Sequence, residues 1–166
     1  VSVGLWVKPG VSMGHVPNLI GKGTNNSYSY RLMLTNNYIG AGSRAGIDWG
    51  INVAYANAQT EWDCGVGATD CASVWTHAVG TYDSVSQTAK LYINGVLVST
   101  ATGVAAPTSN ANPVELGRSL YDSSYWYFTG LMDDARIYNY ALTATQVKTL
   151  MNEGFSNRYG PSTGAP

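Results

Sequence analysis

The sequence predicts an all-β fold in which two antiparallel sheets pack as a sandwich, with one short helix near the C-terminus. Short apolar runs recur along the 166 residues and are separated by Gly, Asn and Pro, a spacing typical of β-sandwiches. Only 11% of the residues are charged, whereas there are 19 Gly and 12 Tyr, as in a β domain rich in turns. The length suits one domain. We place it at residues 1–155 and interpret residues 156–166, which are small, polar and Pro-bearing, as a linker or tail.

The expected strands follow from apolar runs that end at turn residues. The first covers Val1–Val7, where small or polar and apolar residues alternate until Lys-Pro-Gly. Asn94-Gly95 tolerates positive φ and predicts a tight hairpin turn. The other expected strands lie at residues 18–23, 28–35, 37–43, 46–56, 75–83, 89–95, 96–102 and 112–119 and within 127–142.

One segment has helical rather than strand periodicity. Thr143 followed by Gln146 forms a capping-box pattern, and we expect a short amphipathic helix over residues 144–153. Gly154 is a candidate for the C′ position that ends it. The apolar positions at helical spacing are Val147, Leu150 and Met151.

The two cysteines, Cys64 and Cys71, flank a Gly-rich loop. A closed zinc site needs four ligands, and neither histidine lies nearby in sequence. We therefore expect a local disulfide, which indicates an oxidising compartment and an extracellular or cell-surface location. A net charge of −1 gives no strong attraction to nucleic acid or anionic membrane. No apolar run is long enough to insert into a membrane as a spanning helix.

Several stretches of the second half of the chain form a recognisable series, with VGLWVKP as an early strand; they are WTHAVGTYD, LYINGVLV, ELG and FTGLMDDARIYNYALTATQV. In this order they resemble the LamG-like jelly-roll family of the concanavalin A-like lectin and glucanase superfamily. The resemblance implies a jelly-roll sandwich. It is close over about residues 75–153 and loose over residues 24–74. The fold hosts lectins, adhesion modules, enzyme-attached carbohydrate-binding modules and whole enzymes, so it does not by itself decide the function.

The resemblance also implies a strand that this sequence lacks. Family members usually have an extra strand before the Trp-Val-x-Pro strand, and here Val1 already belongs to the latter. The open edge beside the C-terminal strand invites pairing. We expect a preceding segment, a neighbouring domain or another copy of the chain to supply the missing strand.

The stretch EWDCG is a candidate catalytic site. In glucanases of this fold an E-x-D-x-E or E-x-D-x-x-E strand carries the acids, and Glu61 and Asp63 match its first two. Gly65 and Val66 occupy the positions of the second Glu. Retaining glycoside hydrolysis needs two suitably placed carboxyl groups. We therefore expect a polar hairpin end and no enzyme activity.

The two histidines, His15 and His77, do not form a catalytic motif either. His77 could be a general base, but the family resemblance makes it a packed strand residue. His15 has no flanking catalytic motif.

Ligand recognition is expected from aromatic and polar side chains in two stretches, because sugar sites combine aromatic walls with a few placed polar groups. For each of these aromatics, burial in the core remains an alternative. Three others, Trp6, Trp75 and Phe128, are expected in or near the core. The candidates are Trp49, Tyr55 and Trp62 on strands, and Arg118, Tyr121, Asp122, Tyr125 and Trp126 in a loop-like segment.

A structural calcium site is implied by the resemblance. In glucanases that close with D-x-V-R-[IV]-Y, the Asp is a calcium ligand, and Asp133 in DDARIY matches it. The carbonyls of Lys22 and Gly23 match the loop that completes such sites, since calcium takes 6–8 oxygen ligands. The alternative is that Asp133 pairs with Arg136 or caps a turn.

These expectations combine into a non-catalytic, extracellular carbohydrate-binding module of a secreted enzyme or adhesin, with a neutral polysaccharide or glycan as its ligand. The alternative is a protein-binding or structural adhesion or filament module with the same fold. A glycoside-active catalytic domain comes third.

Overall fold

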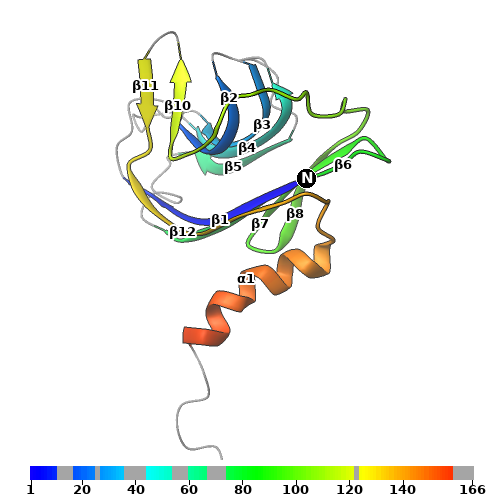
Figure 1. Cartoon of the computed structure of the whole chain (residues 1–166). Coiled ribbons are helices and arrows are strands. Elements are labelled where there is room, and N and C mark those ends of the chain that lie inside the picture. Colours follow the sequence, from blue (N-terminus) through cyan, green and yellow to red (C-terminus); the bar gives the residue numbers. More distant parts are fainter. Residues whose placement is uncertain are drawn as a thin grey trace, which may run out of the picture.

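The computed structural model describes residues 1–10, 17–24, 27–35, 44–53, 60–66, 74–121 and 124–158. These residues form a two-layer antiparallel sandwich with one helix below it, as predicted (Figure 1). Among the described residues, no helix is long and apolar enough to span a membrane.

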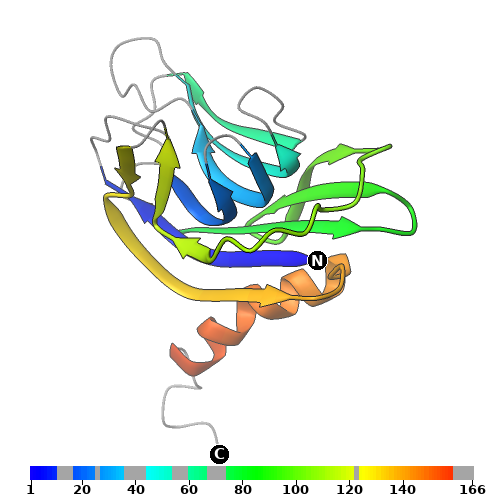
Figure 2. The same ribbon diagram turned by 45° about the horizontal axis from the view of Figure 1, so that its top comes forward.

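The first sheet contains both the first and the last strand of the described chain, β1 and β12. Its strand order is β12-β1-β6-β7-β8, and every neighbouring pair is antiparallel. β1 and β12 lie side by side, with Ser2 opposite Tyr138 and Pro9 opposite Gly130 (Figure 2). Its strands are β1 (Ser2–Pro9), β6 (Thr76–Asp83), β7 (Thr88–Ile93), β8 (Val96–Ala101) and β12 (Gly130–Tyr138).

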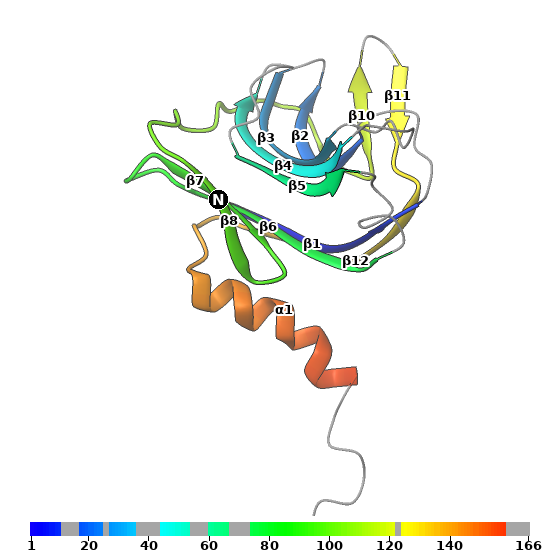
Figure 3. The same ribbon diagram turned by 180° about the vertical axis from the view of Figure 1, so that it is seen from behind.

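The second sheet has the order β5-β4-β3-β2-β9 and curves over the first (Figure 3). A two-stranded hairpin, β10–β11, stands beside β2 (Figure 1). The expected strand at 37–43 lies outside the described residues. The strands of this layer are β2 (Asn18–Thr24), β3 (Ser27–Thr35), β4 (Arg44–Val53), β5 (Thr60–Val66), β9 (Val114–Leu116), β10 (Arg118–Tyr121) and β11 (Ser124–Tyr127).

The hydrophobic core fills the space between the sheets. Alternate residues of β1, Val3, Leu5 and Val7, meet Leu32 of β3 and other apolar side chains of the second sheet. Trp49 lies in the middle of this core. A Cβ on Gly80 would lie 2.1 Å from the Trp49 ring, so the absent side chain is what admits the indole.

Helix α1 (Ala144–Arg158) covers the outer face of the first sheet. The predicted capping box is confirmed, because the Thr143 amide donates to Gln146 Oε1 at 2.8 Å and the Gln146 amide donates to Thr143 Oγ1 at 3.3 Å. The predicted stop at Gly154 is wrong. The helix continues to Arg158, into the stretch expected to be a tail, while residues 159–166 lie outside the described chain. The contact between helix and sheet is a cluster of Val79, Tyr92, Leu142, Val147 and Leu150.

The residues expected in or near the core are all partly buried. Trp6, Trp75 and Phe128 are half-buried, and Phe128 packs against the core cluster. Trp6 lies on the helix-covered face, where its ring is 5.1 Å from that of His77, centroid to centroid.

The sandwich is open along one side, where β12 ends the first sheet and β9 ends the second. Ile137 lies opposite Val3 and Leu116 lies opposite Ile20, both core residues, so their side chains belong to the inward faces. Ile137 is nevertheless 46% exposed and Leu116 53% exposed. In the described part of the chain, no strand lies beyond β12 to cover them.

Candidate functional site

The face of the second sheet that points away from the core is polar. Side chains alternate across a strand, and the core takes Tyr30, Leu32 and Leu34 from β3. Arg31 and Met33 therefore lie on the outer face, together with Asp48 of β4, which is opposite Met33. Few polar side chains are fully buried without a reason. On this face, however, Asn18, Ser29, Arg31, Asp48 and Glu115 are all buried.

Two glycines form part of the floor of this face. A row across the sheet runs from Glu115 through Gly21 and Arg31 to Gly50. A Cβ on Gly21 would lie 2.8 Å from Asn18 Nδ2, so glycine lets the Asn18 amide lie against the strand. Charged and bare positions thus alternate along the row.

The hairpin β10–β11 flanks the same face. The sequence suggested a loop for this segment, and the structure corrects that to two strands in which Arg118 is opposite Tyr127 and Ser119 opposite Trp126. The turn between β9 and β10 uses Gly117 at φ 70°, a conformation that glycine adopts readily.

An ion pair joins the hairpin to the sheet. Arg118 Nη2 lies 2.7 Å from Glu115 Oε1, and Arg118 Nε donates to the same oxygen at 3.0 Å. The Arg118 side chain is 41% exposed and that of Glu115 only 6%. Arg118 was predicted as a site residue, and the structure places it at the rim of the polar face. Trp126, half-buried on β11, is the predicted aromatic nearest to it in the register.

Trp49 is the predicted ligand residue that the structure moves elsewhere. It is 0% exposed in the core, and its Nε1 donates to the Thr81 carbonyl at 3.0 Å. Its ring cannot stack on a ligand at the surface, and this expectation is wrong because Gly80 gives the indole a place between the sheets.

The remaining ligand candidates are only partly described. Trp62 lies on β5 opposite Ile47, and Tyr121 and Tyr125 lie on the hairpin. The structure describes the backbone of these three residues but not their side chains. Tyr55 and Asp122 lie outside the described residues.

The two acids of EWDCG, Glu61 and Asp63, lie on β5, and the structure describes their backbone but not their side chains. Glu61 lies opposite Asp48 and Asp63 opposite Gly46 on β4. The predicted disulfide also falls here, with Cys64 on β5 and Cys71 outside the described residues.

His77 lies in the first sheet, under the helix, rather than near the polar face. It is buried, and burial, with a smaller effect from the Arg136 charge, lowers its pKa from 6.5 to about 4. Its backbone amide donates to Asn94 Oδ1 at 2.9 Å, which ties it to the β7–β8 turn. His15 lies outside the described residues.

The structure separates the donors expected for calcium. Asp133 lies opposite Trp6, on the outer face of the first sheet, whereas Lys22 and Gly23 belong to β2 of the second sheet. The Asp133 carboxylate therefore points away from those two carbonyls. Among the described residues, no group of three His, Cys, Asp or Glu side chains could hold a metal. The three predicted ligands do not fit a shared ion.

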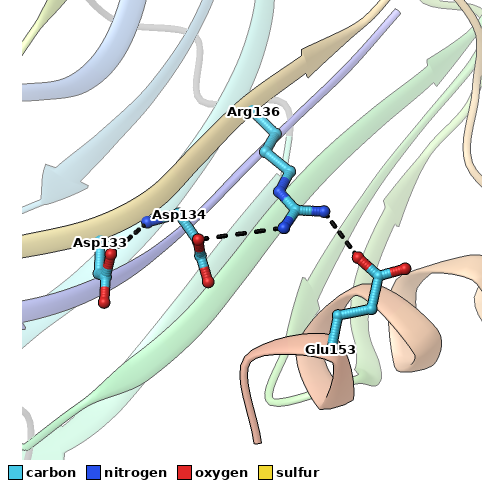
Figure 4. A network of polar contacts seen from close by, with 4 residues as sticks. All are labelled: Asp133, Asp134, Arg136 and Glu153. Carbon is cyan, nitrogen blue, oxygen red and sulfur yellow. Dashed lines mark hydrogen bonds and ion pairs between the residues drawn. The ribbon is translucent and has the colours of Figure 1, made fainter. Parts of the chain in front are cut away.

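Asp133 takes part in local polar contacts instead (Figure 4). Its Oδ1 accepts a hydrogen bond from the Asp134 amide at 2.9 Å. Arg136 Nη1 lies 2.7 Å from Glu153 Oε2 and Arg136 Nη2 lies 3.9 Å from Asp134 Oδ1. Arg136 thus links β12 to helix α1.

The sequence interpretation missed the polar residues Asn18, Arg31, Asp48, Glu115 and Ser119. A signal for one of them was present. In YSYRLMLT the residues Tyr30, Leu32 and Leu34 alternate with Arg31 and Met33, which marks Arg31 as facing away from the core. Asn18 is the first residue of β2, and Glu115 belongs to the three-residue strand β9, so alternation is too short to read at either position.

Solved structures with the same fold include sugar-binding domains. Domain 4 of an extracellular arabinanase of Geobacillus stearothermophilus, solved with arabinotriose, is 28% identical with a TM-score of 0.58 over 90% of this chain. The chain spans 65% of that domain's length. The CBM40 module of a Ruminococcus gnavus IT-sialidase bound to α2,3-sialyllactose is 20% identical, with a TM-score of 0.62, and covers 90% of this chain and 81% of its own.

A pentraxin of Limulus polyphemus is 18% identical with a TM-score of 0.64, covering 90% of this chain and 68% of its own. No curated protein sequence matches the chain. The family model described as the concanavalin A-like lectin/glucanases superfamily matches residues 1–148. With the antiparallel sandwich and its strand order, this match shows that the chain belongs to the concanavalin A-like lectin/glucanase superfamily.

Proposed function

We propose that this chain is a non-catalytic module that binds a neutral glycan on the outer face of the second sheet, beside hairpin β10–β11. The observation that carries the proposal is the set of buried polar side chains on that face, which ends at the exposed Arg118. Sugar sites combine a few fixed polar groups with an aromatic wall. Trp126 on the hairpin is a suitable wall residue.

The relatives support this use of the fold. The arabinanase domain, at 28% identity, was solved with arabinotriose. That protein is extracellular, and we extend the same location to this chain, as part of a secreted enzyme or an adhesin. The separation of His77 from the polar face favours binding over catalysis, because a general base must reach the reacting proton.

A glycan array followed by calorimetric titration tests the proposal. The wild-type chain should bind neutral oligosaccharides, and Trp126→Ala should weaken binding by about fivefold, because stacking of an aromatic ring contributes on the order of 1 kcal/mol. Tyr140→Ala, an exposed aromatic after β12, is the matched control and should leave binding unchanged. Absence of binding to every plant, algal and host glycan on the array would refute the proposal.

The second candidate is a protein-binding or structural adhesion module. The exposed, inward-facing Ile137 and Leu116 along the open side of the sandwich favour it. This alternative would be supported if the chain bound no glycan on the array and bound an added peptide strand along β12. Glycoside hydrolysis is the third candidate, and an activity assay of Glu61→Gln would test it.

A further inference from the structure

Three polar side chains lie near one another at the start of β2. Asn18 begins the strand, and its amide lies against Gly21, where a Cβ would be 2.8 Å from Asn18 Nδ2. Glu115 of β9 lies opposite Gly21, on the same outer face. The Gly117 amide donates to the Leu19 carbonyl at 3.0 Å, which keeps the chain beside β2 as it enters β10. Ser119 therefore runs alongside the first residues of β2. Asn18, Glu115 and Ser119 thus come from three neighbouring strands, β2, β9 and β10, at one corner of the second sheet.

These side chains have unused hydrogen-bonding capacity. Asn18 is 1% exposed, Glu115 7% and Ser119 6%. Within the described part of the chain, Asn18 Oδ1 and Nδ2, Glu115 Oε2 and Ser119 Oγ have no hydrogen-bond partner. Leaving one buried polar group unsatisfied costs about 1–3 kcal/mol. Native proteins rarely accept several such costs together, unless a bound molecule or water meets them.

The mixture of donors and acceptors selects the chemistry of the bound molecule. Asn18 Nδ2 can only donate, Glu115 Oε2 as a carboxylate can only accept, and the Ser119 hydroxyl can do both. A hydroxyl group also does both, so two adjacent hydroxyls can satisfy the set.

Charged ligands fit less well. A metal cation would leave the Asn18 amide donor unmet and would lie close to the Arg118 guanidinium, 2.7 Å from Glu115. An anionic sugar would meet the free oxygen of the Glu115 carboxylate, and like charges repel. The neighbourhood therefore favours a neutral ligand.

We propose that Asn18, Glu115 and Ser119 bind two neighbouring hydroxyl groups of a neutral sugar, with Arg118 as the residue that positions Glu115. This inference rests on the proposed function and narrows it to neutral sugars that carry a free vicinal diol. Arg118, whose side chain is 41% exposed, is the solvent-facing residue beside these buried groups.

Ser119→Ala is the first test because it should lower the affinity for sugar without lowering the melting temperature. In the free protein the hydroxyl has no partner in the described chain, so its removal should leave the melting temperature unchanged or raise it. Titration calorimetry with arabinotriose, and with the strongest neutral oligosaccharide of the array, should show affinity lowered by about fivefold. Ser86→Ala, in the exposed β6–β7 turn, is the control and should bind as wild type does.

Glu115→Gln is the second variant, and Glu153→Gln is its matched control. Each glutamate pairs with an arginine at 2.7 Å, but Glu153 does so at the helix, away from the polar face. Loss of a charged acceptor should lower the affinity of Glu115→Gln for the same sugars by about tenfold or more. Glu153→Gln should bind unchanged.

The possible failures can be told apart. If wild type binds no array glycan, the proposed function itself fails. If wild type binds and both Ser119→Ala and Glu115→Gln bind equally well, only this inference is overturned. A lowered melting temperature of Ser119→Ala with unchanged affinity would assign the hydroxyl to a water-filled structural pocket. Preference of the wild type for sialyllactose over lactose would overturn the neutral assignment.

Discussion

Replacing Trp49 by Phe separates a core role of this side chain from a ligand role. The indole is fully buried, and its Nε1 donates to the Thr81 carbonyl, which is also buried. Phe removes that donor, which costs about 1 kcal/mol or somewhat more for the carbonyl left unsatisfied. It also removes about three ring atoms, worth roughly 2 kcal/mol in lost burial. The free energy of unfolding should therefore fall by about 3 kcal/mol.

Urea unfolding of the two proteins measures this loss, with an unchanged m value as the sign that both unfold alike. For a domain of this size the melting temperature should fall by about 6–12 °C. The affinity of the folded variant for glycans should equal that of wild type. Tyr127→Phe, on the exposed hairpin strand, is the control for stability and should change it by less than about 0.5 kcal/mol. A stable Trp49→Phe protein with reduced glycan affinity would refute the core assignment.

Four further predictions concern the rest of the chain. The pKa of His77 is lower when folded, about 4, than its ordinary 6.5. The stabilisation that neutral His77 provides should therefore be fully present above pH 6.5, and the free energy of unfolding should fall by roughly 3 kcal/mol as the pH drops to 4. Unfolding measured over that pH range tests this, and His77→Gln should not show the loss. Non-reducing alkylation and intact mass should find Cys64 and Cys71 bridged; two free thiols would contradict it. Calcium should leave the melting temperature equal to that measured with chelator, because Asp133 points away from the Lys22 and Gly23 carbonyls, and a rise with calcium would contradict this separation. Finally, the free edge of β12 should pair with another strand, and sedimentation that finds only monomers, with fast amide exchange at Ile137, would count against it.

The layers of the fold were predictable because strand and helix periods are local. The hairpin β6–β7 follows from alternating residues that end in Asp83, and the helix start follows from Thr143 and Gln146, whose reciprocal bonds form as expected. Its end was not predictable from Gly154. Glycine within a helix costs only about 1 kcal/mol relative to alanine, so the residues around it can carry the helix on to Arg158.

Trp49 shows why an aromatic residue in a strand is ambiguous. Its own neighbours in sequence, Asp48 and Gly50, are polar or bare, which makes the strand look like a binding surface. The deciding residue is Gly80, which lies on the other sheet and is distant in sequence. No periodicity within β4 reports such a contact. Burial of a large side chain is thus settled by its partner across the core.

The polar face illustrates the same dependence in reverse. Arg118 was predicted from its aromatic surroundings, but its role comes from Glu115, three residues earlier, in the strand that precedes the turn at Gly117. That turn, at which the Gly117 amide donates to the Leu19 carbonyl, runs β10 alongside the start of β2, from a distant part of the sequence. Side chains that each look ordinary in sequence become a site when antiparallel strands bring their ends together. Their unmet donors and acceptors, more than the aromatics, then indicate that the missing partner carries hydroxyl groups.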